Sequence, residues 1–243
     1  GHAFLNADDP MTPLLASLRP NGPATTFGRS DSADVRCVRE ERSPGGNRFW
    51  LADGRECRLP VPGRHNISNA LAALAVCRHL GLLDQAVQRL ATFQLPELRF
   101  NVRQYGPVTV IADCYNANPR SMTAALDEMD AMPCPGRRLM VCGDMLEMGA
   151  HEERVHRELG RRLARSAVDT LFTVGRAPRW TAETVTQTRP IHVAHYTTVH
   201  EAAEPVASRL LPGDTILIKG SHSIQLETLV EAVRQRFQPA GAA

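Results

Sequence analysis

Hydrophobic and polar positions follow two different rhythms along the chain. In the first sixty residues, short apolar segments are separated by turn residues, which predicts strands. The dipeptide Asp53-Gly54 stands between the last two segments and is typical of a hairpin turn, because glycine accepts a positive φ at low cost. We therefore expect a patch of antiparallel strands at one edge of a domain. The predicted strands are Ala3–Leu5, Val35–Val38, Phe49–Ala52 and Glu56–Val61.

Helical spacing follows this region. Apolar residues recur every three or four positions from Ile67 to Leu80, and Gly81 stands where a helix C-cap belongs. A second helix is predicted from Leu83 to Thr92, before a linker at residues 95–97 (Leu-Pro-Glu).

An earlier helix is predicted near the start of the chain. Asp9 can cap it, with Pro10 at its first position. Leu14, Leu15 and Leu18 are then expected to form its buried stripe.

From residue 98 onward, apolar strands of four or five residues alternate with helices of ten to fourteen. This alternation indicates βαβ units and a parallel, doubly wound sheet, so the chain is expected to be α/β. Ligands of such sheets gather at the carboxyl ends of the strands. The strands are expected at Val108–Ala112, Leu139–Cys142, Leu171–Val174, Ile191–Val193 and Thr215–Ile218.

Composition excludes several classes of protein. Hydrophobic residues make up 43% of the 243 and charged residues 22%, which is too apolar for a disordered chain. The 28 basic residues nearly balance the 26 acidic ones, unlike a dedicated nucleic-acid binder. The longest apolar run, Ala70–Cys77, falls far short of the roughly 20 residues that a membrane span needs. The six cysteines form no CxxC pair, which favours reduced thiols over a zinc ribbon or a disulfide framework.

Polar residues follow the first strand of the second half. Asn118 and Pro119 suit a helix start, as N-cap and first helical residue. Capping does not explain Asp113, Tyr115 or Asn116. A carboxylate at a strand end can accept hydrogen bonds from the two hydroxyls of a ribose.

Two more strand ends carry charged residues. Asp144 and Glu147 lie between glycines, either in a solvated turn or as groups that hold Mg²⁺ through water or bind an amine. Lys219 precedes Gly220 and Ser221, where a lysine can meet a carboxylate or a phosphate. The GxxxxGK[ST] phosphate-binding loop occurs nowhere in the chain.

Three further positions are candidates. Asn66 and Asn69 lie one turn apart at a helix start; capping needs only one of them, and two carboxamides can read the edge of a base such as adenine. Arg99 is either a surface residue or a phosphate contact at a domain junction. His151 and His156 are five residues apart, roughly 140° around a helix, which argues against a shared zinc ion.

Together these motifs resemble the Mur ligase family. The resemblance is carried by FLNADDP, GRHNISNALAALAV, the lone Arg99, DCYNANPRSM, GDMLEMG with a following His156, and DTILIKGS, in family order over essentially the whole chain. It implies that residues 1–97 are the later part of a central ATPase domain with a mixed sheet. Residues 98–243 would be a complete Rossmann-like C-terminal domain, and the phosphate-binding loop and metal ligands would precede residue 1.

The resemblance implies ATP-dependent amide formation through an acyl phosphate, with ATP and Mg²⁺ as cofactors. UDP-N-acetylmuramoyl-tripeptide and D-alanyl-D-alanine are the implied substrates of a cytoplasmic enzyme, expected to be a monomer; the isolated chain is expected to be inactive. Arg99 and Lys219 would be catalytic, with no metal ligand in this chain. Nucleotide would be bound by Asn66, Asn69, Arg99, Asp113 and Tyr115, and substrate by Asn116, Asn118 and Ser221.

Two positions depart from the family pattern. Cys114 replaces a serine, for which little effect is expected, and His222 stands where arginine is common, which would weaken any anion contact there. Three alternatives stay open: a sister Mur ligase, a ligase of the folylpolyglutamate synthase type, and a non-catalytic fragment that binds a nucleotide or peptide.

Overall fold

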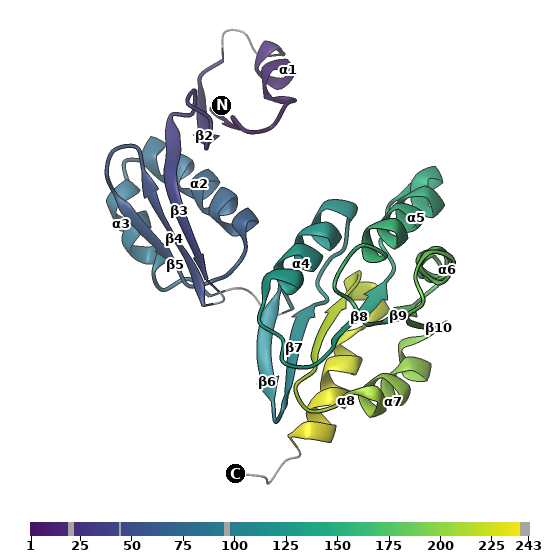
Figure 1. Cartoon of the computed structure of the whole chain (residues 1–243). Coiled ribbons are helices and arrows are strands. Elements are labelled where there is room, and N and C mark those ends of the chain that lie inside the picture. Colours follow the sequence, from purple (N-terminus) through teal and green to yellow (C-terminus); the bar gives the residue numbers. More distant parts are fainter. Residues whose placement is uncertain (19–21, 44, 95–97, 239–243) are drawn as a thin grey trace. The chain divides into compact units, whose positions relative to one another are not determined.

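The computed structural model describes residues 1–18, 22–43, 45–94 and 98–238. The chain divides into two compact units, which we call unit 1 (residues 1–94) and unit 2 (residues 95–243) (Figure 1). The predicted linker, Leu95-Pro96-Glu97, lies outside the described residues.

Unit 1 is built on a five-stranded mixed sheet in the order β1-β2-β3-β4-β5. Strands β1, β2 and β3 are parallel, whereas β3, β4 and β5 are antiparallel, which confirms the predicted patch. The sequence pattern missed β2. The elements are β1 (Ala3–Asn6), α1 (Thr12–Ser17), β2 (Ala24–Gly28), β3 (Val35–Ser43), β4 (Gly46–Leu51), β5 (Glu56–Leu59), α2 (Arg64–His79) and α3 (Leu83–Leu90).

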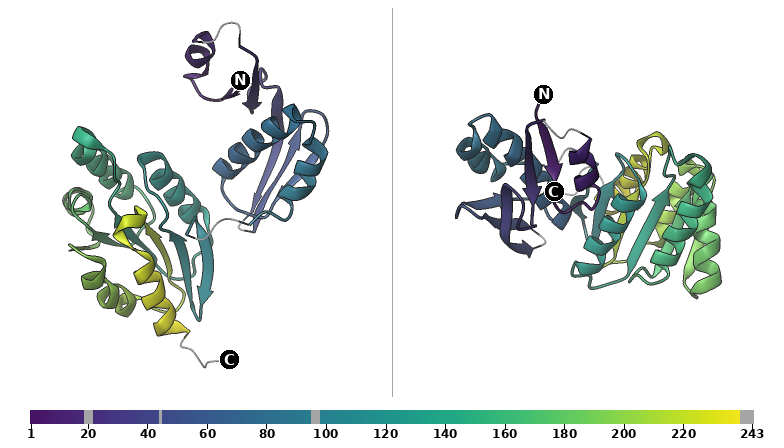
Figure 2. Two further views of the ribbon diagram at one scale, coloured as in Figure 1. Left: turned by 180° about the vertical axis from the view of Figure 1, so that it is seen from behind. Right: turned by 90° about the horizontal axis from the view of Figure 1, so that it is seen from above.

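One face of this sheet is covered by α2 and α3 (Figure 2). Alternate residues of β4 and β5 point into the layer between sheet and helices, so that Phe49 and Cys57 are fully buried. Asn47 is a polar member of this layer. Its Nδ2 donates to the carbonyls of Val61 (2.6 Å) and Gly63 (3.1 Å), and these bonds hold the chain where it enters α2.

The predicted buried stripe of the first helix is wrong. Leu14, Leu15 and Leu18 have exposed fractions of 53%, 48% and 70%. Asp9 does not cap the helix; it accepts a hydrogen bond from the Met11 amide in a local turn (2.9 Å). The helix starts only at Thr12 and ends at Ser17, so Leu18 lies beyond it, and none of its six residues is buried.

Unit 2 is a Rossmann-like layered domain with a six-stranded sheet in the order β10-β9-β8-β11-β7-β6. Five of these strands are parallel and only β6 runs antiparallel. The elements are β6 (Asn101–Tyr105), β7 (Val108–Asp113), α4 (Pro119–Ala131), β8 (Arg138–Gly143), α5 (Glu152–Leu163), β9 (Thr170–Val174), α6 (Pro178–Thr188), β10 (His192–Tyr196), α7 (Val199–Arg209), β11 (Thr215–Lys219) and α8 (Glu227–Phe237). Two 3₁₀ turns, η1 (Gly149–His151) and η2 (His222–Ile224), follow β8 and β11.

Helices cover both faces of this sheet (Figure 1). Helices α4, α5 and α6 pack on one face around Met122, Leu126 and Leu159, and α7 and α8 pack on the other with Val206 and Leu229. Because both faces of the parallel strands are buried, their sequences are nearly unbroken apolar runs. The predicted α/β class is confirmed, and β6 is the strand that the pattern missed.

Two chemical features accompany the fold. In the described part of the chain, no helix is long and apolar enough to cross a membrane. Each of the six cysteines is a free thiol.

Candidate functional site

A buried ion pair joins two strand ends of unit 2. Strands β7 and β11 are neighbours, and their register places Lys219 beside Asp113. The Lys219 Nζ lies 2.7 Å from Asp113 Oδ2 and donates a second bond to the Asn116 carbonyl (2.9 Å). The Lys219 side chain is 1% exposed and that of Asp113 15%. The lysine thus meets a carboxylate of this chain, one of the two kinds of partner considered from the sequence, and it fixes the loop that follows β7.

The segment before β6 is fastened to the same strand end. Phe100 N–H donates to Asp113 Oδ1 (3.2 Å), and Tyr115 N–H donates to the Leu98 carbonyl (3.1 Å). Leu98 and Phe100 both have a positive φ, 62° and 48°. Such a backbone costs of order 1–3 kcal/mol per non-glycine residue and persists only where surrounding contacts hold it.

Arg99 lies between these two strained residues and is exposed. Its Cζ is 4.2 Å from the centroid of the Tyr115 ring, a cation–π contact. The His222 ring stacks on the same tyrosine at 6.1 Å with an interplanar angle of 24°. Arg99, Tyr115 and His222 thus converge beside the Asp113–Lys219 pair.

The rest of the β7–α4 loop is ordered by local bonds. Asn118 is the N-cap of α4 in a capping box with Ser121, as the Asn-Pro pattern predicts. Asn116 Oδ1 accepts from the Ala117 amide (2.8 Å) while its carbonyl is held by Lys219. The Cys114 thiol is fully buried, and burial raises its pKa to about 12.

The strand end after β8 is a solvated turn at Glu147, which is exposed, but not at Asp144. Asp144 is 6% exposed and accepts hydrogen bonds from the backbone N–H groups of Ala177 (2.8 Å) and Arg176 (3.2 Å). Burial raises the pKa of its carboxyl against the opposing effect of these bonds. Its own carbonyl accepts from Ser221 N–H (2.9 Å), so Asp144 links the loops after β8, β9 and β11. A β-carbon at Gly175 would lie 2.0 Å from Asp144 Oδ2, a close approach that requires glycine.

His156, like Asp144, is a buried polar side chain, and the sequence motifs did not indicate its partners. Met145 N–H donates to its Nε2 (3.4 Å), and Nδ1 lies 3.1 Å from Thr181 Oγ1. Burial lowers the pKa of this imidazole to about 4, so the ring is neutral at pH 7. Over the described ranges, no three His, Cys, Asp or Glu side chains gather so as to hold a metal ion.

The paired asparagines of unit 1 lie together at the start of α2. Asn66 is buried and donates through Nδ2 to the Pro62 carbonyl (2.7 Å), while its Oδ1 accepts from Asn69 Nδ2 (3.3 Å). Asn69 is exposed. The Asn69 carboxamide therefore faces solvent, and the buried Asn66 holds it in place.

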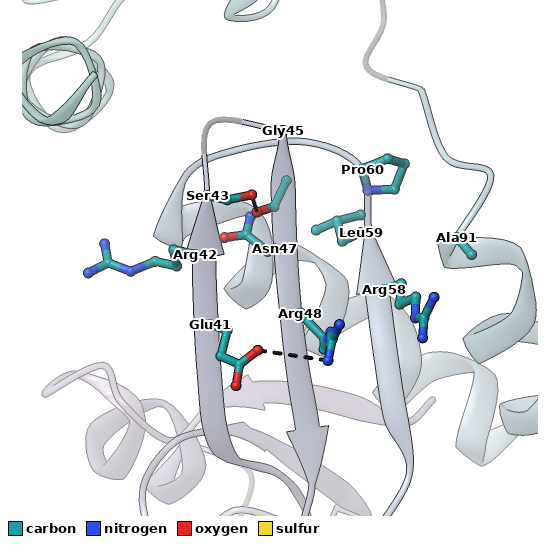
Figure 3. A pocket seen from close by; sticks show the side chains of 11 residues that line it. Glu41, Arg42, Ser43, Gly45, Asn47, Arg48, Arg58, Leu59, Pro60 and Ala91 are labelled. Atoms are coloured by element: carbon teal, nitrogen blue, oxygen red, sulfur yellow. Dashed lines mark hydrogen bonds and ion pairs between the residues drawn. The ribbon is translucent and has the colours of Figure 1, made fainter. Parts of the chain in front are cut away.

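A separate hollow of about 580 Å³ lies in unit 1 at the tip of the β3–β4 hairpin (Figure 3). Three arginines line it, Arg42, Arg48 and Arg58, together with Glu41. None of the site residues predicted from the sequence belongs to its lining.

Comparisons with known proteins agree with this architecture. Residues 98–222 match the Mur ligase glutamate ligase domain, and residues 1–77 match the Mur ligase middle domain. The chain belongs to the Mur ligase family. It is similar to the UDP-N-acetylmuramoyl-tripeptide–D-alanyl-D-alanine ligases of Bacillus subtilis (32% identity, 85% of this chain and 46% of that protein) and Escherichia coli (35%, 73% and 38%).

A crystal structure of MurF from Acinetobacter baumannii superimposes with a TM-score of 0.84 at 29% identity, covering 97% of this chain and 52% of that one. The chain thus spans about half the length of the curated relatives that it matches.

Proposed function

We propose that these residues form part of an ATP-dependent ligase that adds D-alanyl-D-alanine to UDP-N-acetylmuramoyl-tripeptide in peptidoglycan precursor synthesis. The observation that carries the proposal is the cluster at the ends of β7 and β11, at the edge that binds ligands in parallel sheets. There Asp113 pairs with Lys219, and Arg99 lies over the ring of Tyr115, which follows β7. The curated relatives named for this reaction support the choice of substrates.

We assign residues 1–97 to the later part of the central ATPase domain and residues 98–243 to the C-terminal domain. The family matches to residues 1–77 and 98–222, and the two compact units, support this division.

The reaction requires a carboxylate to gain a leaving group. Transfer of the γ-phosphoryl group of ATP to the tripeptide carboxylate gives an acyl phosphate and ADP. Attack by the D-alanyl-D-alanine amine then forms the amide and releases phosphate and a proton. Both steps concentrate negative charge, so preorganised cations and hydrogen-bond donors are the groups that accelerate them.

Asp113 is assigned to the ribose of ATP. An ionised carboxylate has about four acceptor positions, and Lys219 and the Phe100 amide use only two. The remaining lone pairs suit two vicinal hydroxyls. Arg99 is assigned to a phosphate; among the ion pairs of the described residues, none links it to a carboxylate.

The other assignments follow from exposure and position. Asn66 and Asn69 would contact adenine, and Tyr115 would lie beside the nucleotide site, next to Arg99. Asn116, Asn118 and Ser221 would line the dipeptide site. Lys219 acts in this scheme by holding Asp113 and the Asn116 carbonyl, because its ammonium is buried and already bonded to both.

The triphosphate cradle is not among these residues, since the sequence has no GxxxxGK[ST] motif. We therefore propose that the 243 residues alone do not catalyse ligation. Mg²⁺ enters the proposal as the partner of ATP, and no residue of this chain is assigned to it. We further propose that the enzyme is cytoplasmic, because ATP and a UDP-linked precursor are its substrates, and that it is a monomer.

The test is a phosphate-release assay on these residues joined to the part of the Bacillus subtilis relative that they do not match. We expect release to require both UDP-N-acetylmuramoyl-tripeptide and D-alanyl-D-alanine, and to be absent with the 243 residues alone. Release driven by meso-diaminopimelate or glutamate would assign a sister ligase. Nucleotide binding without release in the joined protein would favour a non-catalytic binding fragment.

A further inference from the structure

We propose that Tyr115 is a positioning residue that aims Arg99, and that it acts through the arginine rather than on the nucleotide. This inference rests on the proposed function for its phosphate ligand, but its geometry can be tested without that ligand. It begins from the contact of the Arg99 guanidinium with the Tyr115 ring at 4.2 Å.

The backbone around Arg99 is held in a costly shape. Leu98 and Phe100 are bulky residues in the left-handed region, with φ of 62° and 48°. Glycine or asparagine would adopt this conformation more readily. A turn of this kind keeps its shape only if contacts outside it hold it there.

The hydrogen bonds that hold the turn come from the end of β7. The Leu98 carbonyl accepts from Tyr115 N–H, and Phe100 N–H donates to Asp113 Oδ1. Phe100 is buried in the hydrophobic core beneath α4, and β6 begins at the next residue with Asn101 opposite Ala112. The backbone of the turn is thus fixed at both sides of Arg99, and only the arginine side chain stays free.

Tyr115 supplies the restraint on that side chain. The tyrosine backbone is bonded to Leu98, and its ring contacts both the Arg99 guanidinium and the His222 ring. The ring is 49% exposed, which rules out a core-packing role. A guanidinium lying over an aromatic face keeps its charge and its donors while it loses side-chain freedom, which preorganises it for an anion.

The first test is spectroscopic and needs no ligand. In NMR spectra of the full 243-residue chain, the Arg99 side-chain protons should show an upfield ring-current shift. Tyr115→Phe should keep the shift and Tyr115→Leu should abolish it. Arg39, whose Cζ lies 4.4 Å over the Trp50 ring in unit 1, provides the matched control and should not respond to either change. An Arg99 without a ring-current shift in the unmodified chain would overturn the proposal.

The second test uses ATP as the probe, titrated into the same variants after the chain has been joined to the part of the Bacillus subtilis relative that it does not match. Tyr115→Leu should weaken ATP binding by about two- to fivefold, the size of an exposed cation–π contact, and Tyr115→Phe should restore it. In the double variant with Arg99→Ala, the tyrosine change should have no further effect, since it acts through the arginine. Additive effects would show direct contact between Tyr115 and the nucleotide and contradict the proposal. Absence of ATP binding in every sample, with the ring-current shift present, would count against the proposed function alone.

Discussion

The buried polar side chains of the two units are held in different ways. In unit 1, Asn47, Asn66 and Asn69 bond to groups no more than sixteen residues away. In unit 2, Lys219 reaches Asn116 across 103 positions of sequence, and Arg137 reaches Asp214 across 77. Local bonds form as soon as a helix or hairpin forms, whereas long-range ion pairs exist only in the finished sheet. Polar groups of unit 2 should therefore be more sensitive to single changes.

The chain offers a direct way to compare the units. Its two tryptophans are Trp50 in unit 1 and Trp180 in unit 2. Replacing either one with phenylalanine leaves a fluorescence signal from the other unit alone. Urea unfolding of these two parent variants then reports each unit separately.

The largest effect is expected for Lys219→Met in unit 2. It leaves the carboxylate of Asp113 in a largely buried place without its cation, which costs about 3–5 kcal/mol. Urea unfolding followed by Trp180 measures this loss. The double change Lys219→Met with Asp113→Leu should recover most of it, because no uncompensated charge remains. A single variant as stable as its parent would show that the pair is not buried in solution.

Acid should weaken unit 2 through His156. Its pKa is lowered to about 4 in the folded state against 6.5 when exposed, so the unfolded chain binds the additional proton between these values. The contribution of the neutral ring is present above pH 6.5 and falls by about 3 kcal/mol as the pH drops to 4. His156→Gln should flatten this part of the pH dependence in Trp180 unfolding curves. If the stability of His156→Gln and of its parent fell equally between pH 6.5 and 4, the loss could not come from protonation of His156.

A moderate effect is expected for Asn47→Ala in unit 1. The change removes two hydrogen bonds to the Val61 and Gly63 carbonyls and leaves them buried, at a cost of about 1–3 kcal/mol. Unfolding followed by Trp50 measures it. Arg48→Ala, the exposed neighbour on the same strand, is the control and should unfold near the parent midpoint. Equal shifts of the urea midpoint for both variants would mean that the Asn47 hydrogen bonds stabilise unit 1 no more than the exposed Arg48 side chain does.

The smallest effect is expected for Leu14→Ser in α1. The side chain is 53% exposed, so its replacement should change stability by no more than about 0.5 kcal/mol. Leu71→Ala in α2, at a fully buried position, should cost about 2–5 kcal/mol by the same Trp50 measurement. A large loss for Leu14→Ser would indicate that α1 packs against another surface.

Much of the fold could be predicted because its signals are local. The apolar runs of β7, β8, β9 and β11 and the Asn-Pro start of α4 each lie within a few residues. Strands β2 and β6 escaped prediction because β2 is only half-buried, and β6 is a largely exposed edge strand whose polar residues do not alternate with apolar ones. The leucines of α1 were wrongly predicted to be buried, because a local turn at Asp9 makes the helix start later than the sequence indicates.

In the candidate site, too, local features could be predicted from the sequence and long-range contacts could not. Asp113, Arg99 and Lys219 could be selected from strand-end position and family resemblance. Their mutual contacts, the positive φ values beside Arg99 and the buried bonds of Asp144 could not, because each depends on which strands become neighbours. The roles given to the site residues, and the domain boundary at residue 97, stay predictions.

The central claim is that the ends of β7 and β11 hold the ribose of ATP through Asp113. NMR titration of the chain with ATP and with 2′,3′-dideoxy-ATP tests it most directly. We expect ATP to shift the amide signals around Asp113 and Tyr115. The analogue without ribose hydroxyls should bind at least about tenfold more weakly, since each lost bond to a charged group is worth about 1.5–3 kcal/mol. Equal binding of the two nucleotides, or shifts confined to other parts of the chain, would contradict the claim.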